Sequence, residues 1–340
     1  MKRSIYGMTP TALREYFRSI GENPAKADIV FDGVYRRGIA DFCELGFSAG
    51  TTERLGEDLS FALAETAAVN RCENAAKLLL RLADGELVET VLMRQKFGAW
   101  VCVSTQVGCA MGCAFCQSGR LKKRRSLAAE EIVGQAITVS RELGVKINGI
   151  SVMGIGEPFD NFAAVSDFCG IVCAPKGLAL GERHVTVSTC GIVPMIYEYA
   201  ALPHPCNPAI SLHAPNDALR DALMPINRRY PLSEVMTAAE YFSEKTNRRV
   251  TLEYVMLDGV NDTPALAEQL CSLIDSRRFY VNIIPYNSTD SSFKPSGRER
   301  IMRFYDVLKR NGIVVTMRRK FGAELKAACG QLRSDYGDGV

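Results

Sequence analysis

From Ala99 onward the chain alternates short β-rich runs with helical stretches, and this alternation limits the fold more than any other feature. The β-rich runs are 99–105, 149–153, 184–189, 208–212, 250–256, 280–284 and 313–317. The helical stretches between them include 128–143, 162–173, 193–202, 232–245, 265–275 and 298–311. This order predicts an α/β fold with a parallel sheet, open or barrel-like, whose chemistry sits at the carboxyl ends of the strands.

The first part of the chain carries mainly helical signals. Thr9-Pro10 and Asn23-Pro24 each resemble an N-cap followed by proline, and they predict helices over 11–20 and from Pro24 to about Arg36. Residues 52–69 also have helical spacing, whereas 78–82 and 87–93, separated by Asp84-Gly85, predict a hairpin. We expect a small helical accessory domain with the start of the hairpin at 1–85, an α/β domain at 86–333 and a tail at 334–340.

The 12 cysteines need a chemical explanation, because nothing in the sequence predicts an oxidising compartment. No apolar run approaches the roughly 18 to 20 residues of a membrane helix, and no apolar stretch follows the basic start as in a secretory signal. We therefore expect a cytoplasmic protein with no membrane partner. In that reducing compartment, clustered cysteines usually bind metal or carry out redox or catalytic chemistry.

Three of these cysteines form the motif Cys109-x3-Cys113-x2-Cys116, directly after the first β-rich run of the series. Thiolates this close together are best accommodated around one soft metal centre. A structural zinc site normally has four ligands, and no histidine or fourth cysteine lies within the motif. Three ligands fit an iron–sulfur cluster with one open iron. A zinc-stabilised RNA-binding module with a distant fourth ligand is the alternative.

Basic residues concentrate in the last part of the chain. Residues 294–333 contain 11 Lys and Arg but only three Asp and Glu, although the whole chain has a net charge of only +3. A second basic group is Lys122, Lys123, Arg124 and Arg125. Taken singly, such a group is usually part of a solvated surface. Together, the two groups fit binding to a polyanion such as RNA. The candidate RNA contacts are Lys122, Lys123, Arg124, Arg125, Arg318, Arg319 and Lys320.

The cysteine motif resembles that of the radical S-adenosylmethionine enzymes, because Phe115 fills the aromatic position before the last cysteine. The resemblance implies a partial (β/α) barrel and a 4Fe-4S cluster on Cys109, Cys113 and Cys116. The cluster would bind S-adenosylmethionine and cleave it to a 5′-deoxyadenosyl radical. Polar residues at successive strand ends fit a shared ligand. The cofactor-binding candidates are Gly156 and Glu157 in Gly154-Ile155-Gly156-Glu157-Pro158, then Ser188, Ser211, Leu212, His213 and Asn287.

Further stretches resemble the RlmN and Cfr family of radical S-adenosylmethionine RNA methyltransferases. They include Cys102, seven residues before the triad, and Cys329 followed by Gly-Gln. Other matches are 188–194, 211–215, 223–227, 259–262 and 285–287. The resemblance covers roughly Phe31 to Leu332 and is most specific from Val88 onward. The remaining seven cysteines match no catalytic position and are interpreted as structural thiols.

The resemblance also implies a mechanism that uses two S-adenosylmethionine molecules per turnover. Cys329 would take a methyl group and become S-methylcysteine, whose carbon would then be joined to adenine through radical chemistry. Glu89 would accept the ring proton, and Cys102 would attack the sulfur of Cys329 to release the product as a transient disulfide forms. From the residues alone, Glu89 would be one surface acid on a hairpin.

The implied substrate is an adenosine at the peptidyl transferase centre of 23S rRNA, taken as a protein-poor precursor, with a tRNA anticodon-loop adenosine as a second substrate. An electron-donating and disulfide-reducing protein would be needed as a partner. The segments around Glu89 and Gln106 favour methylation of carbon 2, as in the RlmN branch. The alternatives are methylation of carbon 8, which gives antibiotic resistance, and a radical enzyme that acts on a small molecule or peptide.

Overall fold

The computed structural model describes residues 2–288, 292–318 and 331, so the expected sites at Arg319, Lys320 and Cys329 lie outside the described residues. Its main feature is a ten-stranded sheet with the order β14-β13-β12-β11-β10-β9-β6-β5-β4-β3. The strands are β3 (Glu65–Cys72), β4 (Ala75–Arg81), β5 (Leu87–Gln95), β6 (Gly98–Cys102), β9 (Ile147–Val152), β10 (Val185–Thr189), β11 (Asn207–Ser211), β12 (Val250–Met256), β13 (Phe279–Pro285) and β14 (Val315–Met317).

Neighbouring strands from β6 to β14 pair in parallel, whereas β3, β4, β5 and β6 pair antiparallel. The interior strand β12 is buried at every position, as expected for a parallel strand covered on both faces. The two ends of the sheet, β3 and β14, do not pair with each other in the described part of the chain. The fold is therefore the α/β partial barrel that the sequence predicts.

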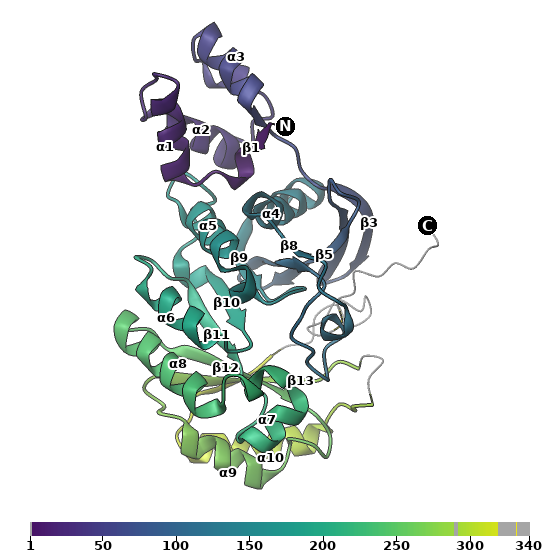
Figure 1. The fold of residues 1–340 in the computed structure, drawn as a ribbon. Helices are drawn as coiled ribbons and strands as arrows, with labels where there is room; N and C mark the ends of the chain where they lie inside the picture. Colours follow the sequence, from purple (N-terminus) through teal and green to yellow (C-terminus); the bar gives the residue numbers. More distant parts are fainter. Residues whose placement is uncertain (1, 289–291, 319–330, 332–340) are drawn as a thin grey trace.

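Helices connect the parallel strands and follow one another along the sheet (Figure 1). They are α4 (Ala129–Leu143), α5 (Phe162–Cys173), α6 (Val193–Ala201), α7 (Asp217–Leu223), α8 (Leu232–Thr246), α9 (Pro264–Leu273) and α10 (Arg298–Arg310). A short second sheet pairs β7 (Gln106–Val107) with β8 (Arg125–Ser126), and short 3₁₀ helices include η4 (Ser118–Arg120) and η5 (Pro158–Asn161). Six of these helices match the predicted stretches within two residues; α7 was not predicted.

The amino-terminal helices form a group above the sheet in Figure 1. They are η1 (Ile5–Gly7), α1 (Pro10–Ser19), α2 (Lys26–Asp32), a π-helical turn η2 (Gly33–Arg37), η3 (Phe42–Leu45) and α3 (Ala49–Asp58), with β1 (Arg3–Ser4) paired to β2 (Leu59–Ser60). As expected, Thr9 caps α1 by accepting from Ala12 N. The group contacts the barrel through Tyr6, whose ring lies 5.8 Å from the Arg141 guanidinium carbon on α4.

The helix predicted over 52–69 is wrong in its second half. Helix α3 ends at Asp58, and Glu65–Cys72 is the edge strand β3, paired antiparallel with β4. Four of the eight residues of β3 are Ala, Glu or Arg, which favour helices, but pairing with the buried strand β4 outweighs that local preference. Strands β3 and β4 thus lie within the residue range of the expected 1–85 domain but belong to the ten-stranded sheet.

Among the described residues, no helix is both long and apolar enough to cross a bilayer.

The close packing of β6 against β9 gives a test of the sheet. A Cβ atom at Gly149 would lie 2.7 Å from ring atoms of Trp100, its partner on β6. We predict that Gly149→Ala lowers the free energy of unfolding by about 1–3 kcal/mol, measured by denaturant titration, because the indole must move. Gly170 is an exposed position of α5, where a Cβ atom would meet nothing within 4 Å, so Gly170→Ala should be neutral or stabilising. Equal midpoints for the two variants would contradict this packing.

Candidate active site

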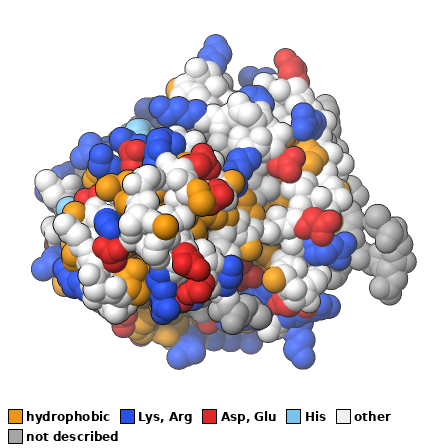
Figure 2. Space-filling view, turned by 90° about the horizontal axis from the view of Figure 1, so that it is seen from above, with side chains coloured by type: hydrophobic (Ala, Val, Ile, Leu, Met, Phe, Trp, Pro, Cys, Tyr) orange, Lys and Arg blue, Asp and Glu red, His pale blue; other side chains and the backbone are white. Residues whose placement is uncertain are grey.

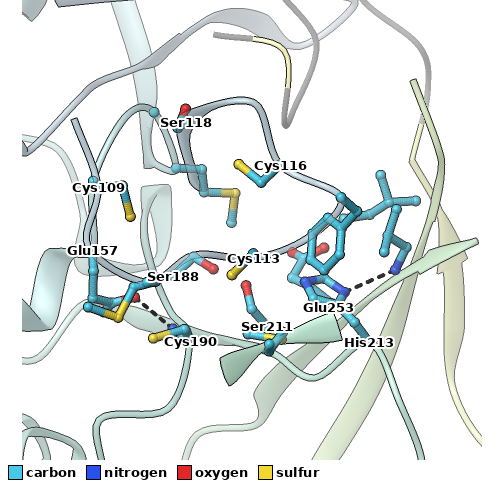
Figure 3. A pocket seen from close by; sticks show the side chains of 18 of the residues that line it. Cys109, Cys113, Cys116, Ser118, Glu157, Ser188, Cys190, Ser211, His213 and Glu253 are labelled. Atoms are coloured by element: carbon cyan, nitrogen blue, oxygen red, sulfur yellow. Dashed lines mark hydrogen bonds between the residues drawn. The ribbon is translucent and has the colours of Figure 1, made fainter. Parts of the chain in front are cut away.

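One pocket lies at the carboxyl ends of the parallel strands and brings together most of the predicted site residues (Figure 3). Its lining includes Cys109, Cys113, Cys116, Gly156, Glu157, Ser188, Ser211 and His213. Leu212 does not line the pocket, because its side chain is fully buried in the main core, and Asn287 is not among the lining residues either. The structure therefore brings seven of the predicted polar or cysteine side chains, together with Gly156, to one pocket, and it leaves Leu212 and Asn287 outside the lining.

The three cysteines lie on a loop between β7 and η4 whose backbone is fixed at several points. Cys109 N donates to Leu121 O at 3.1 Å, and Ala114 N donates to Leu223 O at 2.9 Å. Gly108 has φ +74°, and a Cβ there would lie 2.3 Å from Lys122 O, so only glycine fits. The loop therefore holds its thiols at one wall of the pocket.

Burial sets the protonation of these thiols. It raises the pKa of Cys109 to about 12 and that of Cys113 well above its usual value, and the neighbouring cysteines and Glu157 add to the effect. Without a cationic centre the thiols of Cys109 and Cys113 would stay neutral, whereas metal binding deprotonates such groups. The described residues contain no group of three or more Cys, His, Asp or Glu that could hold one metal ion. Cysteine ligands of a four-iron cluster bind separate irons, so this donor set fits a cluster.

Glu157 occupies the wall beside the cysteines and is almost fully buried. Its Oε1 accepts from Phe159 N at 3.0 Å and its Oε2 accepts from Cys190 N at 2.8 Å. Gly156 before it has φ +107° and packs against Gln106, whose Oε1 accepts from Glu157 N. Burial raises the pKa of Glu157, while these hydrogen bonds favour the carboxylate. The remaining lone pairs can accept from an ammonium group.

His213 closes another side of the pocket as a neutral imidazole. Burial, with a smaller effect of Arg220, lowers the pKa of His213 to about 3. Val255 N donates to His213 Nδ1 at 3.1 Å, which leaves the proton on Nε2. The ring packs edge-on against Phe115 at a centroid distance of 4.8 Å, so His213 buttresses the triad loop.

Two charged pocket residues were not predicted as cofactor contacts. Glu253, at the middle of β12, is buried, and its Oε2 accepts from Asn282 Nδ2 at 2.8 Å. Arg318 follows β14, with its Nη1 3.9 Å from Glu253 Oε2 and its Nη2 3.3 Å from Met153 Sδ. Arg318 was expected on an RNA-binding surface, but its partly buried side chain lines the pocket. A mid-strand glutamate carries no strand-end signal, so sequence reasoning had no way to find it.

Glu89 and Cys102 lie on adjacent antiparallel strands at the side of the pocket. Cys102 is opposite Val91, so Glu89, Val91 and Cys102 point to the same face of the sheet. Cys102 packs in a small cluster with Val91 and Ile155, and Met153, which lines the pocket, packs against that cluster. Glu89 is buried, with its Oε1 2.7 Å from Lys77 Nζ, so its interpretation as a surface acid is wrong.

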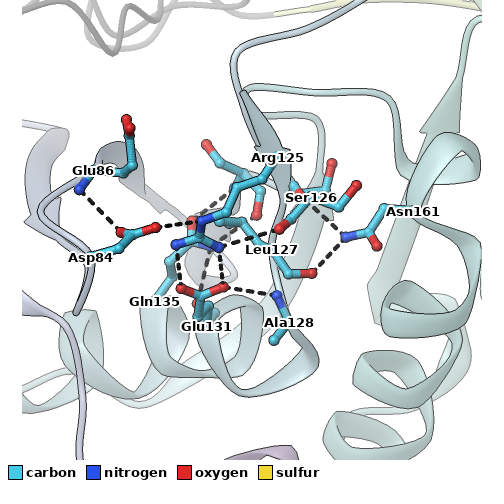
Figure 4. A network of polar contacts seen from close by, with 11 residues as sticks. Asp84, Glu86, Arg125, Ser126, Leu127, Ala128, Glu131, Gln135 and Asn161 are labelled. Carbon is cyan, nitrogen blue, oxygen red and sulfur yellow. Dashed lines mark hydrogen bonds and ion pairs between the residues drawn. The ribbon is translucent and has the colours of Figure 1, made fainter. Parts of the chain in front are cut away.

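The basic group at 122–125 is largely neutralised by acidic partners. Lys123 pairs with Asp160 at 2.6 Å, and Arg124 pairs with Glu86 at 2.8 Å. Arg125 pairs with both Asp84 and Glu131, at 2.6 Å and 2.8 Å (Figure 4). On the face shown in Figure 2, Lys and Arg side chains likewise alternate with Asp and Glu. These ion pairs weaken the case that residues 122–125 form a polyanion-binding surface. They instead attach this segment, which follows the cysteine loop, to α4 and to the β4–β5 turn.

We predict that Arg125→Met lowers the free energy of unfolding by about 1–3 kcal/mol, measured by denaturant titration, because charged hydrogen bonds to Glu131 and Asp84 are lost. Lys122→Met is the matched control. Lys122 is exposed and has no ion pair among the described residues, so its replacement should change stability by less than about 0.5 kcal/mol. Equal effects would show that Arg125 does not anchor the segment.

Similarity to known proteins indicates the same family as the cysteine motif. The Radical SAM superfamily matches residues 103–270. A radical SAM methyltransferase structure from Sphaerobacter thermophilus has a TM-score of 0.91 and 38% identity, over 98% of this chain and all of its own. Probable dual-specificity RNA methyltransferases RlmN from Enterococcus faecalis and Exiguobacterium sibiricum are each 45% identical, over 98% of this chain and 96% of theirs. With identity at this level along nearly the whole chain, the protein belongs to the RlmN family of radical SAM enzymes.

Proposed function

We propose that this protein is a radical S-adenosylmethionine RNA methyltransferase that methylates carbon 2 of an adenosine in 23S rRNA. The observation that carries the proposal is the single pocket in which Cys109, Cys113 and Cys116 face Glu157, in a chain that is 45% identical to RlmN-named RNA methyltransferases. The tRNA anticodon-loop adenosine is the second substrate that we propose, in keeping with the dual specificity named for those relatives. We place the enzyme in the cytoplasm, where thiols stay reduced.

The residues of the pocket fit both cofactors. Cys109, Cys113 and Cys116 would hold a 4Fe-4S cluster and leave one iron open. Glu157 would accept from the ammonium group of S-adenosylmethionine, and Ser188 and Ser211 offer hydroxyls to its other polar groups. When bound, the cluster supplies the electron that cleaves the sulfonium. The nonpolar wall of Met153, Phe115 and Val255 would exclude water from the reacting atoms.

Three residues would take part in the transfer of the methyl group from the cofactor to the RNA. Cys329 takes the methyl as a thioether, using one S-adenosylmethionine, and a second is consumed in the radical step. Glu89, which forms an ion pair with Lys77, accepts the proton that the adenine ring loses. After the unpaired electron left by the radical step has passed to an electron-transfer partner, Cys102 would attack the sulfur of Cys329. The carbon–sulfur bond would break, the released carbon would take up a proton to become the methyl group, and the disulfide that forms would have to be reopened by a reducing protein. The shared face of Glu89 and Cys102 supports these roles.

The proposal needs an electron donor and an RNA that exposes its adenosine. A precursor of 23S rRNA with few bound proteins would offer the peptidyl transferase adenosine to the pocket.

A radical enzyme acting on a small molecule or peptide would share the triad but would have no use for Cys102 and Cys329. Carbon 8 is the alternative position on the same ring.

We predict that Cys102→Ala accumulates a covalent RNA–protein adduct through Cys329, because nothing then attacks the thioether sulfur. Denaturing gel electrophoresis with labelled RNA would detect it. Cys329→Ala, the matched control, should form no adduct and transfer no methyl group, yet should keep its iron. Normal turnover by Cys102→Ala without an adduct would rule out the two-cysteine mechanism.

The most direct test of the substrate is mass spectrometry of ribosomal RNA from cells with and without the gene. We predict 2-methyladenosine at the peptidyl transferase centre only when the gene is present. If the two samples are identical, the assignment to 23S rRNA fails. If 8-methyladenosine appears instead, the choice of carbon 2 is wrong.

A further inference from the structure

A second cavity opens at the end of the sheet opposite to the active site. Its volume is about 940 Å³, and it shares no lining residue with the cysteine pocket in the described part of the chain. Trp100 lines it from β6, Ile147 from the start of β9 and His184 from just before β10. The cavity therefore lies at the amino ends of parallel strands whose carboxyl ends form the active site.

The walls of this cavity come from both parts of the fold. Tyr35 and Arg36 line it from the π-helical turn η2 of the amino-terminal group. Gly144, at the carboxyl end of α4, and residues 177–180, after α5, line it from the barrel. Ligand sites occur preferentially at such junctions, because two parts of a fold leave a concave surface between them.

Aromatic rings give the cavity one half of its chemistry. Phe97 is 68% exposed, the largest exposed fraction among the large hydrophobic side chains of the described residues. It lies in the turn between β5 and β6, and its ring meets that of Trp100 edge-on at a centroid distance of 6.2 Å. Trp100 in turn meets the ring of His184 edge-on at 6.3 Å. An exposed ring beside two others offers its face to another flat ring.

Positive charge gives the other half. The described lining contains Arg36 and Lys146 but no Asp or Glu, and Lys96 precedes Phe97 in the turn. Lys96 and Lys146 form no ion pair with another described residue, and Arg36 has a long one, 3.6 Å from Asp32. Aromatic side chains beside unpaired basic groups are typical of surfaces that bind single-stranded nucleic acid.

We propose that this cavity binds a nucleotide of a single-stranded RNA segment, with its base stacked on Phe97 and its phosphate beside Lys96 and Lys146. The inference rests on the proposed function, because an RNA methyltransferase must hold a substrate far larger than its active-site pocket. Three of the four basic residues at 122–125 are already paired with acidic residues, so the charge near the cysteine loop is less available for this task. The second cavity would hold a segment that flanks the target adenosine.

Trp100 is the only tryptophan of the chain, so its fluorescence reports binding at this cavity directly. The probe is single-stranded polyuridine of about eight nucleotides, which offers no adenine to the active site. It should quench the Trp100 emission of the full-length protein, whereas duplex RNA should not, because its bases are already paired. If uridine monophosphate quenches as strongly as the oligonucleotide, the site binds a free nucleotide and the RNA proposal is wrong.

Two variants test the two halves of the site. Phe97→Ala should weaken the affinity for polyuridine about fivefold or more, because one base loses its stacking partner. Lys146→Gln should also weaken binding, and it should lower the slope of log affinity against log salt by about 0.7. Tyr241→Ala and Lys309→Gln are the matched controls, since both residues are exposed on other helices, α8 and α10, and both variants should bind as the wild type does.

Unchanged affinity in either Phe97→Ala or Lys146→Gln would overturn the proposal, and so would an unchanged Trp100 emission. With the natural RNA substrate, Phe97→Ala should raise KM and leave kcat unchanged, because Phe97 lies away from the cysteine pocket. If the wild-type protein binds polyuridine as expected but methylates neither 23S rRNA nor tRNA, the proposed function fails while the RNA-binding cavity stands.

Discussion

The parallel pairing of the strands from β6 to β14 is the constraint on which the site depends. Parallel strands bring all their carboxyl ends to one edge of the sheet, and the residues that follow each strand therefore meet there. Glu157, Ser188, Ser211 and Arg318 come from four different connections or strand ends yet line one pocket. The cysteine loop packs against that edge.

Around this edge, buried polar groups hold one another in fixed charge states. Burial keeps His213 neutral with its Nδ1 accepting, while Glu157 is hydrogen bonded by two backbone N–H groups. Arg220 donates hydrogen bonds to the carbonyls of Cys190, directly after β10, and Ser211, at the end of β11. The pocket therefore has rigid walls with defined donors and acceptors before any cofactor binds, which is the preorganisation that electrostatic catalysis requires.

The sequence predicted the parallel strands well, because each is a short apolar run between turn signals. It also predicted the triad, Glu157, Ser188, Ser211 and His213 as one site, since the end of a parallel strand is recognisable in a chain. It could not predict that β3 is a strand, because an edge strand made of helix-favouring residues depends on its partner β4. The ion pairs of Lys123, Arg124 and Arg125, and the pocket positions of Glu253 and Arg318, depend on residues distant in the sequence.

The account depends most on the claim that the three cysteines hold an iron–sulfur cluster. Anaerobic purification followed by metal and sulfide analysis tests this directly. We expect a brown protein with about four iron and four sulfide per chain, and near-complete loss of both in Cys113→Ser. A colourless protein with about one zinc per chain would contradict the account and favour a structural metal site.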